Sequence, residues 1–298
     1  MIKAASVTKF LQDSRAVLFG IAIALAVFHL AITWRVVESQ NQLIISGLLW
    51  TGAIYLLWKR REFLHLSSGI VSSLIGTAIV AFVLSKGLTL FWFESSYLRF
   101  VPLLIALSLG LIASGFKGLK QYWREFIIVL MLCIPDGALQ VSIEKIFNIT
   151  TLTAKFSTFG LWYTGFTVMR RGADIILPTG SVSVNIQCTG ITSAIMLLKV
   201  TVPLLFLFPA SLFKRVLLVF GAIAIPFLLS MTRVALLAVV VSNRSTFDFW
   251  HGPIGNEIFS TMAILVFGGV GNWLLRPADP EDFDPTEDFD PDEEFQES

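Results

Sequence analysis

Charged residues are scarce in this chain, and their scarcity excludes an ordinary soluble domain. Only 14% of the 298 residues are Asp, Glu, Lys or Arg, against roughly 25% in soluble domains. Hydrophobic residues make up 55%, and the mean hydropathy is +0.77. One helix needs about 20 residues to cross a bilayer, so about seven to nine crossings would use most of the chain. The composition predicts a polytopic integral membrane protein without a separate large soluble domain.

Cysteine and histidine are also scarce, which limits the chemistry available. The two cysteines, Cys133 and Cys188, are too few and too far apart in sequence to indicate a disulfide framework. Neither belongs to a Cys/His cluster with metal-ligand spacing. We therefore expect no metal site and no cofactor. Nucleic-acid binding has no support either, because the basic residues are scattered over loop ends, where a membrane requires them.

Apolar runs bounded by charged residues predict the membrane topology. We expect eight transmembrane helices, at Ala16–Trp34, Leu43–Trp58, Ser67–Ser85, Leu98–Phe116, Phe126–Val141, Cys188–Phe208, Val216–Val241 and Ile254–Leu275. Lysine and arginine gather at the N-terminus, in alternate loops and after the last span, for example at 59–61, 117–124 and 214–215. The positive-inside rule therefore predicts that both termini are cytoplasmic.

The C-terminal tail differs from the rest of the chain in charge. Residues 279–298 hold eleven acidic and no basic residues, and they repeat Glu-Asp-Phe-Asp-Pro at Glu281–Pro285 and Glu287–Pro291. A proline-interrupted acidic run cannot build a core. The predicted organisation is thus a polytopic membrane domain over residues 1–278 and a disordered, acidic cytoplasmic tail over residues 279–298. The tail is either a solvated charged segment or a docking peptide for a basic partner.

The longest segment between two predicted spans, Pro135–Gln187, falls on the outer side in this topology. Val141–Trp162 has a roughly helical pattern, typical of a helix on the membrane surface. Gly165–Met169 and Ile175–Gln187 are rich in Val, Ile and Ser, with turn signals between and within them, which indicates one or two β-hairpins. The predicted fold class is therefore an all-α integral membrane protein with a small extracytoplasmic helix and β-hairpin insertion before the sixth span.

Two residues near the outer ends of predicted spans could carry chemistry. Cys188 begins the sixth span, and a helix N-terminus favours the thiolate form of a cysteine; the alternative is a small buried apolar side chain. Arg233 lies in the seventh span, roughly 12 Å below its outer end at 1.5 Å per residue. It should face a protein interior or a wet cavity and could stabilise a developing oxyanion, or else snorkel outward or pair with an acid.

A third candidate, His251, precedes the eighth span on the same side of the membrane. The topology puts Cys188, Arg233 and His251 at one face of three consecutive spans, and short connections tend to make such spans neighbours. The other histidines, His29 and His65, share no face with a cysteine and a buried arginine. Lys199 falls near mid-membrane, where it could form a charge pair or line a cavity, unless the helix boundary differs from the predicted one by several residues.

Cys188-Thr189-Gly190, Arg233 one span later, and His251 with Gly252 and Gly255 before the last span together resemble the exosortase/archaeosortase family in order, spacing and membrane side. The resemblance covers essentially the whole chain, is strongest between about Gly165 and Gly271, and has the general character of the cyanobacterial branch, the cyanoexosortases. Two positions depart from the family pattern. Thr189 stands where Ser or Ala is common, and Ser230 stands where an asparagine often precedes the arginine.

The resemblance implies a Cys-Arg-His transpeptidase of the membrane. Cys188 would be the nucleophile, Arg233 the oxyanion-stabilising donor and His251 the general acid/base. The implied partners are exported proteins with a C-terminal sorting signal, made of a short motif, a transmembrane helix and a basic cluster, and a lipid or glycan acceptor. The helix and hairpin before Cys188 are candidates for reading the motif, for instance by strand addition. The alternatives are a purely hydrolytic membrane cysteine protease and a non-enzymatic transporter or scaffold.

Overall fold

The structure, a computed structural model, describes residues 14–37, 40–89 and 95–276. The predicted acidic tail at residues 279–298 lies outside this part of the chain. Helices dominate it: α2 (Ser14–Val37), α3 (Gln40–Lys59), α4 (Ile70–Thr89), α5 (Ser95–Gly118), α6 (Trp123–Cys133), α7 (Asp136–Phe147), α8 (Ile149–Tyr163), α9 (Ile191–Leu207), α10 (Leu212–Val239), α11 (Arg244–His251) and α12 (Pro253–Leu275).

The helices confirm the predicted class of an all-α integral membrane protein. Within the described residues, five helical segments are long and apolar enough to cross a membrane: Ala16–Val36, Ile70–Leu88, Tyr97–Cys133, Leu212–Val239 and Pro253–Leu275. The eight predicted spans correspond to α2, α3, α4, α5, α6, α9, α10 and α12. How many of these helices cross the bilayer stays a prediction.

The segment Tyr97–Cys133 is a helical hairpin, because its chain reverses at the end of α5. Gly115 has a left-handed φ of 65°, which a glycine adopts without the steric cost that a Cβ would bring. Beyond the reversal, α6 runs back along α5, so that a Cβ on Gly110 would meet the side chains of Leu119, Tyr122 and Phe126. This reversal separates the predicted fourth and fifth spans.

The fifth span is shorter than predicted, and its boundary at Val141 is wrong. Helix α6 ends at Cys133, and Ile134 takes an extended conformation before Pro135. The ring of a proline disfavours the helical conformation of the residue before it. A separate helix, α7, then starts at Asp136, so the single predicted helix is two helices joined at a proline.

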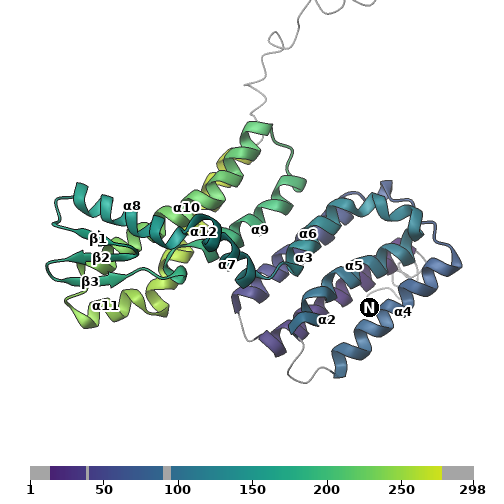
Figure 1. Cartoon of the computed structure of the whole chain (residues 1–298). Coiled ribbons are helices and arrows are strands. Elements are labelled where there is room, and N and C mark those ends of the chain that lie inside the picture. Colours follow the sequence, from purple (N-terminus) through teal and green to yellow (C-terminus); the bar gives the residue numbers. More distant parts are fainter. Residues whose placement is uncertain (1–13, 38–39, 90–94, 277–298) are drawn as a thin grey trace, which may run out of the picture.

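The helices form two groups (Figure 1). The N-terminal bundle, by which we mean α2–α6, encloses one apolar core around Leu49, Val101 and Ile128. The C-terminal half comprises α8, α10, α11, α12 and a small sheet. Helix α9 lies between the groups and packs against α3 of the first and α10 of the second. The two halves are therefore joined through one apolar helix.

The insertion before α9 contains the predicted helix and strands. Strands β1 (Met169–Arg171), β2 (Asp174–Leu177) and β3 (Gly180–Ser183) form an antiparallel sheet in the order β1-β2-β3. Ile175, Val182 and Val184 on one face pack with Ala154 of α8 and Ala238 of α10 in a second buried cluster. The predicted helix over 141–162 is instead two helices, because Asn148 between α7 and α8 takes the left-handed conformation.

The sixth span begins later than predicted. Cys188 lies in the short 3-10 helix η3 (Ile186–Cys188), and α9 starts only at Ile191, after Gly190 with a left-handed φ of 72°. The expectation that Cys188 opens the sixth helix is thus wrong. The thiol stands on a turn between the sheet and the helix.

Candidate active site

The turn that carries Cys188 is held by an asparagine two residues beyond β3. The side-chain oxygen of Asn185 accepts a hydrogen bond from the backbone N–H of Cys188 at 3.2 Å, which is the capping contact that Asn favours at a helix start. The Cys188 side chain is buried in the same apolar cluster as Val184 and Val234. The sequence thus folds locally so that β3 runs directly into the candidate nucleophile.

Gly190 presses this turn against α10. A Cβ at Gly190 would lie 2.5 Å from both the carbonyl oxygen of Pro226 and the hydroxyl oxygen of Ser230, so only glycine fits this close approach. Ser230, which departs from the family pattern, is thus a neighbour of the cysteine turn. Cys188 shares a buried cluster with Val234, the residue after Arg233, so the contact brings the thiol to the segment of α10 that carries Arg233.

Arg233 is buried, with 6% of its surface exposed, and its guanidinium holds the turn between α11 and α12. Nε and Nη2 donate to the backbone carbonyl of Trp250 at 3.3 Å, and Nη2 donates to that of His251 at 3.0 Å. Nη1 donates to the side-chain oxygen of Asn256 at 2.9 Å. Since Nη1 carries two hydrogens, one N–H remains for another acceptor.

The alternative reading of Arg233, that it pairs with an acid, is not what the described residues do. Their ion pairs join Arg60 to Glu125, Arg61 to Glu62, Lys199 to Asp136 and Arg244 to Asp248. Arg233 instead faces two carbonyls and one amide, which are neutral. Its positive charge is therefore not compensated by a carboxylate within the described part of the chain.

His251 is the last residue of α11, and its backbone is fixed while its ring is exposed. A Cβ on Gly255 would lie 2.2 Å from the Trp250 carbonyl oxygen, so this glycine allows the tight turn that aims the carbonyls of Trp250 and His251 at Arg233. The imidazole stacks on Phe247, with ring centroids 5.3 Å apart. Phe247 in turn packs on the cluster that contains Cys188.

The structure therefore places Cys188 against the segment of α10 that carries Arg233, and Arg233 hydrogen-bonds to the backbone of His251. Asn185 and Asn256, which hold Cys188 and Arg233, were not identified from the sequence. Asn185 could have been found from its capping position three residues before Cys188. Nothing in the sequence around Asn256 indicates its contact with Arg233, because that contact depends on how α12 packs against α10. Among the described residues, no group of three His, Cys, Asp or Glu side chains is placed to hold a metal ion.

Of the alternatives for Lys199, the structure shows the charge pair. Its Nζ lies 2.5 Å from the Asp136 carboxylate and donates to the carbonyl of Ile134 at 3.1 Å. Both partners belong to the break between α6 and α7. There the helix ends, and the carbonyl of Ile134 accepts its hydrogen bond from Lys199. Lys199 therefore ties α9, the helix that follows Cys188, to the N-terminal bundle.

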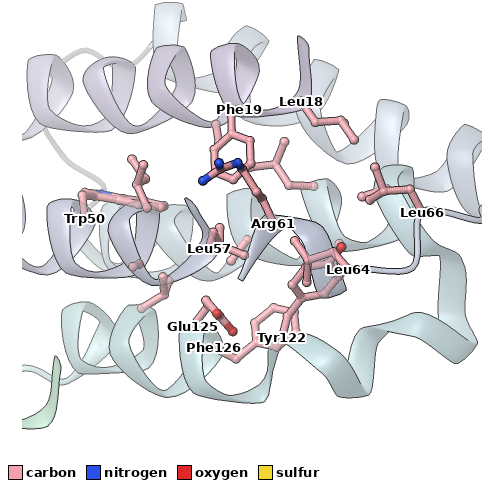
Figure 2. A pocket seen from close by; sticks show the side chains of 18 residues that line it. Leu18, Phe19, Trp50, Leu57, Arg61, Leu64, Leu66, Tyr122, Glu125 and Phe126 are labelled. Atoms are coloured by element: carbon pink, nitrogen blue, oxygen red, sulfur yellow. The ribbon is translucent and has the colours of Figure 1, made fainter. Parts of the chain in front are cut away.

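The N-terminal bundle contains a cavity that is separate from these residues. It has a volume of about 90 Å³ and is mostly apolar, with Phe19, Trp50 and Phe126 in its wall, and Arg61, Tyr122 and Glu125 also line it (Figure 2). Beside it, Arg60 pairs with the buried Glu125 at 3.3 Å and donates to the carbonyl of Gln121.

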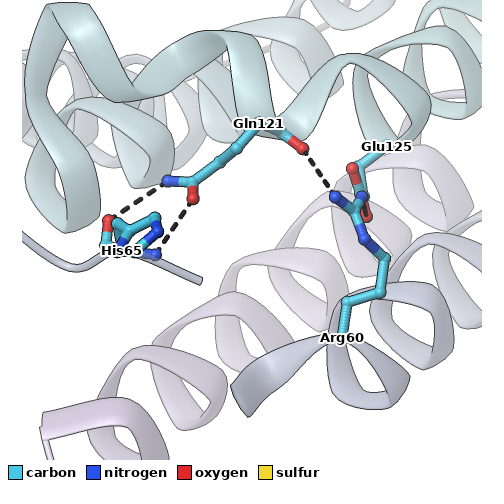
Figure 3. A network of polar contacts seen from close by, with 4 residues as sticks. All are labelled: Arg60, His65, Gln121 and Glu125. Carbon is cyan, nitrogen blue, oxygen red and sulfur yellow. Dashed lines mark hydrogen bonds and ion pairs between the residues drawn. The ribbon is translucent and has the colours of Figure 1, made fainter. Parts of the chain in front are cut away.

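Figure 3 shows that Gln121 continues this network to the backbone of His65. His65 therefore takes part in joining two cytoplasmic loops of the predicted topology. His29, the other histidine outside the candidate site, is buried and accepts a hydrogen bond from the Trp50 indole at 3.2 Å. His29 therefore packs inside the bundle, whereas His65 is exposed and contributes only its backbone.

The chain matches a known protein family. The model of the family described as transmembrane exosortase matches residues 34–268, a range that includes Cys188, Arg233 and His251 and most of the helices of both halves. The match is to the family as a whole and does not distinguish the cyanobacterial branch. No curated protein and no solved structure matches this chain.

Proposed function

We propose, because this chain belongs to the transmembrane exosortase family, that it is a cysteine transpeptidase that cleaves C-terminal sorting signals, with Cys188 as its nucleophile. Membership of the family indicates a membrane-embedded sorting transpeptidase or protease acting on exported proteins. The observation that supports the residue roles is the position of Arg233, which hydrogen-bonds to the backbone of His251 and precedes Val234, a residue of the buried cluster that contains Cys188.

In the first step, His251 takes the proton of the Cys188 thiol, and the thiolate attacks the carbonyl carbon of the scissile peptide bond. A C–S bond forms, and the carbonyl oxygen becomes an oxyanion. The free N–H of Arg233 is available to donate to this oxygen, and the uncompensated guanidinium charge stabilises it. The C–N bond then breaks, the leaving amine takes the proton from His251, and the substrate remains attached to Cys188 as a thioester.

In the second step, an acceptor resolves the thioester. An amine or hydroxyl of a lipid or glycan gives its proton to His251 and attacks the thioester carbon, while the thiolate of Cys188 leaves. Water in the same place would give simple hydrolysis. Because the imidazole is exposed, with one face stacked on Phe247, it can serve the leaving group in the first step and the acceptor in the second.

The proposal places the protein in the bacterial inner (plasma) membrane with both termini cytoplasmic and the site on the extracytoplasmic face. The basic loops that the sequence groups on one side support this orientation. The transmembrane helix of the substrate would then lie among the helices of the chain, with its basic cluster on the cytoplasmic side.

The test is the processing of a co-expressed exported protein that ends in a motif, a transmembrane helix and a basic cluster. The native chain should release a shortened product, and Cys188→Ala, Arg233→Ala and His251→Ala at equal membrane levels should not. The mass of the new C-terminus then separates transfer, which adds the mass of an acceptor, from hydrolysis, which adds only water. Undiminished cleavage by Cys188→Ala would contradict the proposal and favour a scaffold or transporter.

A further inference from the structure

The sheet has an open edge that leads directly to Cys188. β3 pairs with β2 on one side only, since the strand order is β1-β2-β3. Five residues after Ser183, the last residue of β3, comes Cys188. An extended chain spans at most about 3.3 to 3.6 Å per residue, so the edge of β3 and the sulfur are separated by no more than roughly 18 Å.

The backbone groups on this edge can be identified from the register. The N–H of Val184 donates to the carbonyl of Ala173 at 3.1 Å, and Val182 lies opposite Ile175 two residues earlier. Hydrogen-bonded pairs alternate along antiparallel strands, so the N–H and C=O groups of Ser181 and Ser183 point away from β2. The backbone hydrogen bonds of the described residues give these four groups no partner outside the sheet.

The two edges of the sheet differ in protection. β1, on the opposite edge, carries the exposed arginines Arg170 and Arg171, and charged side chains on an edge strand discourage further pairing. β3 carries only the exposed serines 181 and 183 around the buried Val182. Of the two edges, the one that leads to the candidate nucleophile is therefore the one that is open to another strand.

We propose that the segment of the substrate next to the scissile bond binds as a fourth strand on the edge of β3. Its backbone would pair with Ser181 and Ser183, and its next residues would reach Cys188. This inference rests on the proposed function and adds the mode of recognition. The partner is an extended peptide held mainly by its backbone, with the paired residues within about five positions of the bond that is cleaved.

The surroundings of β3 fit this position. Val182, Val184 and Cys188 belong to one apolar cluster, and Phe247, whose ring stacks on His251, packs against it. A peptide that runs along β3 toward Cys188 is therefore led toward His251 as well. Strand addition would bring the scissile carbonyl to the sulfur without a deep pocket for each side chain, because main-chain hydrogen bonds supply the affinity.

The test uses one proline variant on each edge strand of the sheet. Each variant removes one backbone N–H that points away from the neighbouring strand. Ser183→Pro deletes a donor that faces away from β2, and proline is tolerated at edge positions of this kind. Arg170→Pro is the matched control: Arg170 lies opposite Ile175, whose own polar groups face β3, so the N–H of Arg170 also points outward. A third variant, Ser183→Ala, removes the hydroxyl and keeps the backbone donor.

Processing of the co-expressed substrate should fall by about tenfold in Ser183→Pro, the upper range for one lost hydrogen bond. Arg170→Pro and Ser183→Ala should stay within about twofold of the native chain. Membrane levels and the rate of Cys188 alkylation by iodoacetamide should be equal in all four proteins, which would show that the cysteine turn is intact.

Equal processing by Ser183→Pro and the native chain would overturn strand addition, and so would an equal loss in Ser183→Ala, which would indicate recognition of the side chain. Neither result affects the proposed function, which fails only if Cys188→Ala still processes the substrate. A Ser183→Pro protein with altered alkylation is replaced by Ser181→Pro, which removes the other outward donor of β3 and must show the same loss.

Discussion

The N-terminal bundle and the C-terminal half both hold an arginine among helices, but its partners differ. In the bundle, Arg60 faces the buried carboxylate of Glu125 at 3.3 Å. In the C-terminal half, Arg233 donates to the carbonyls of Trp250 and His251 and to the amide of Asn256. The first charge is neutralised by its partner, whereas the second is held in place by neutral groups.

Under the proposed function, this difference separates an arginine that stabilises the fold from one that serves the reaction. Burying a charge without a counter-ion costs free energy, so the presence of such a charge in the folded protein needs an explanation. An arginine that must stabilise a thiolate or an oxyanion has to keep its charge available, so neutral acceptors are the suitable way to fix it. By the same contrast, the cavity of the bundle, beside which Arg60 is neutralised by Glu125, is a weaker candidate for catalysis than the turn around Arg233.

The cysteines give the largest expected effect. Each half contains one: Cys133 ends α6 in the bundle, and Cys188 precedes α9. Cys188→Ala should abolish processing, whereas Cys133→Ala should leave it within about twofold of the native chain, because small apolar replacements of a partly buried thiol are mild. Immunoblots of the processed substrate at equal membrane levels measure both. Loss in Cys133→Ala alone would move the nucleophile to the bundle.

The arginines come next. Arg233→Gln keeps most of the side chain and removes the charge, and we expect a loss of about 10²- to 10³-fold in processing rate, the range seen when an oxyanion donor is removed. Arg60→Gln should change the rate by less than about threefold. Similar losses in both variants would show that the two arginines support the fold in the same way. Such a result would contradict a special role for the uncompensated charge of Arg233.

Asn256 should have a smaller effect, because it acts through Arg233. Asn256→Ala removes the amide that accepts from Nη1, and a hydrogen bond to a charged group is worth about 1.5 kcal/mol at the low end, or roughly a tenfold loss in rate. Asn256→Asp keeps the acceptor but adds a negative charge beside the guanidinium. We expect it to bind Arg233 firmly yet process substrate poorly; recovery of the full rate in this variant would contradict the need for an uncompensated charge.

Removing the ion pair between Arg60 and Glu125 should have the smallest effect on processing. Its effect should appear in the stability of the fold instead. Arg60→Ala leaves the buried Glu125 without its ion partner and should lower the free energy of unfolding by about 1–3 kcal/mol, seen as a lower thermal midpoint in detergent. Arg60→Met combined with Glu125→Leu removes both charges and should recover most of that loss. A double variant no more stable than Arg60→Ala would show that the pair does not act as a unit.

Hydropathy was sufficient to predict the long apolar helices, while the membrane side of the three candidate residues stays a prediction. A long apolar run has few alternatives to a helix in a membrane, so the predicted spans match α2–α6, α9, α10 and α12. The proline itself indicates the break at Pro135, so the prediction that the fifth span continues through it is wrong.

The local geometry of the site could not be predicted in the same way. That α9 starts at Ile191, after Cys188, depends on the contact of Gly190 with the carbonyl of Pro226 on another helix. The partners of Arg233 and Lys199 are set by packing between segments 17 to 65 residues apart. Such contacts have no periodic signature in the chain, and they decide which charges are compensated.

The most direct test is to capture the intermediate on the cysteine. Native membranes containing the substrate are denatured in acid during processing, digested, and searched by mass spectrometry for a substrate fragment attached to the peptide that contains Cys188. The account predicts an adduct on Cys188 that hydroxylamine releases, as expected of a thioester, and that is absent from Cys188→Ala. An adduct on another residue, or rapid processing in Cys188→Ala, would contradict it.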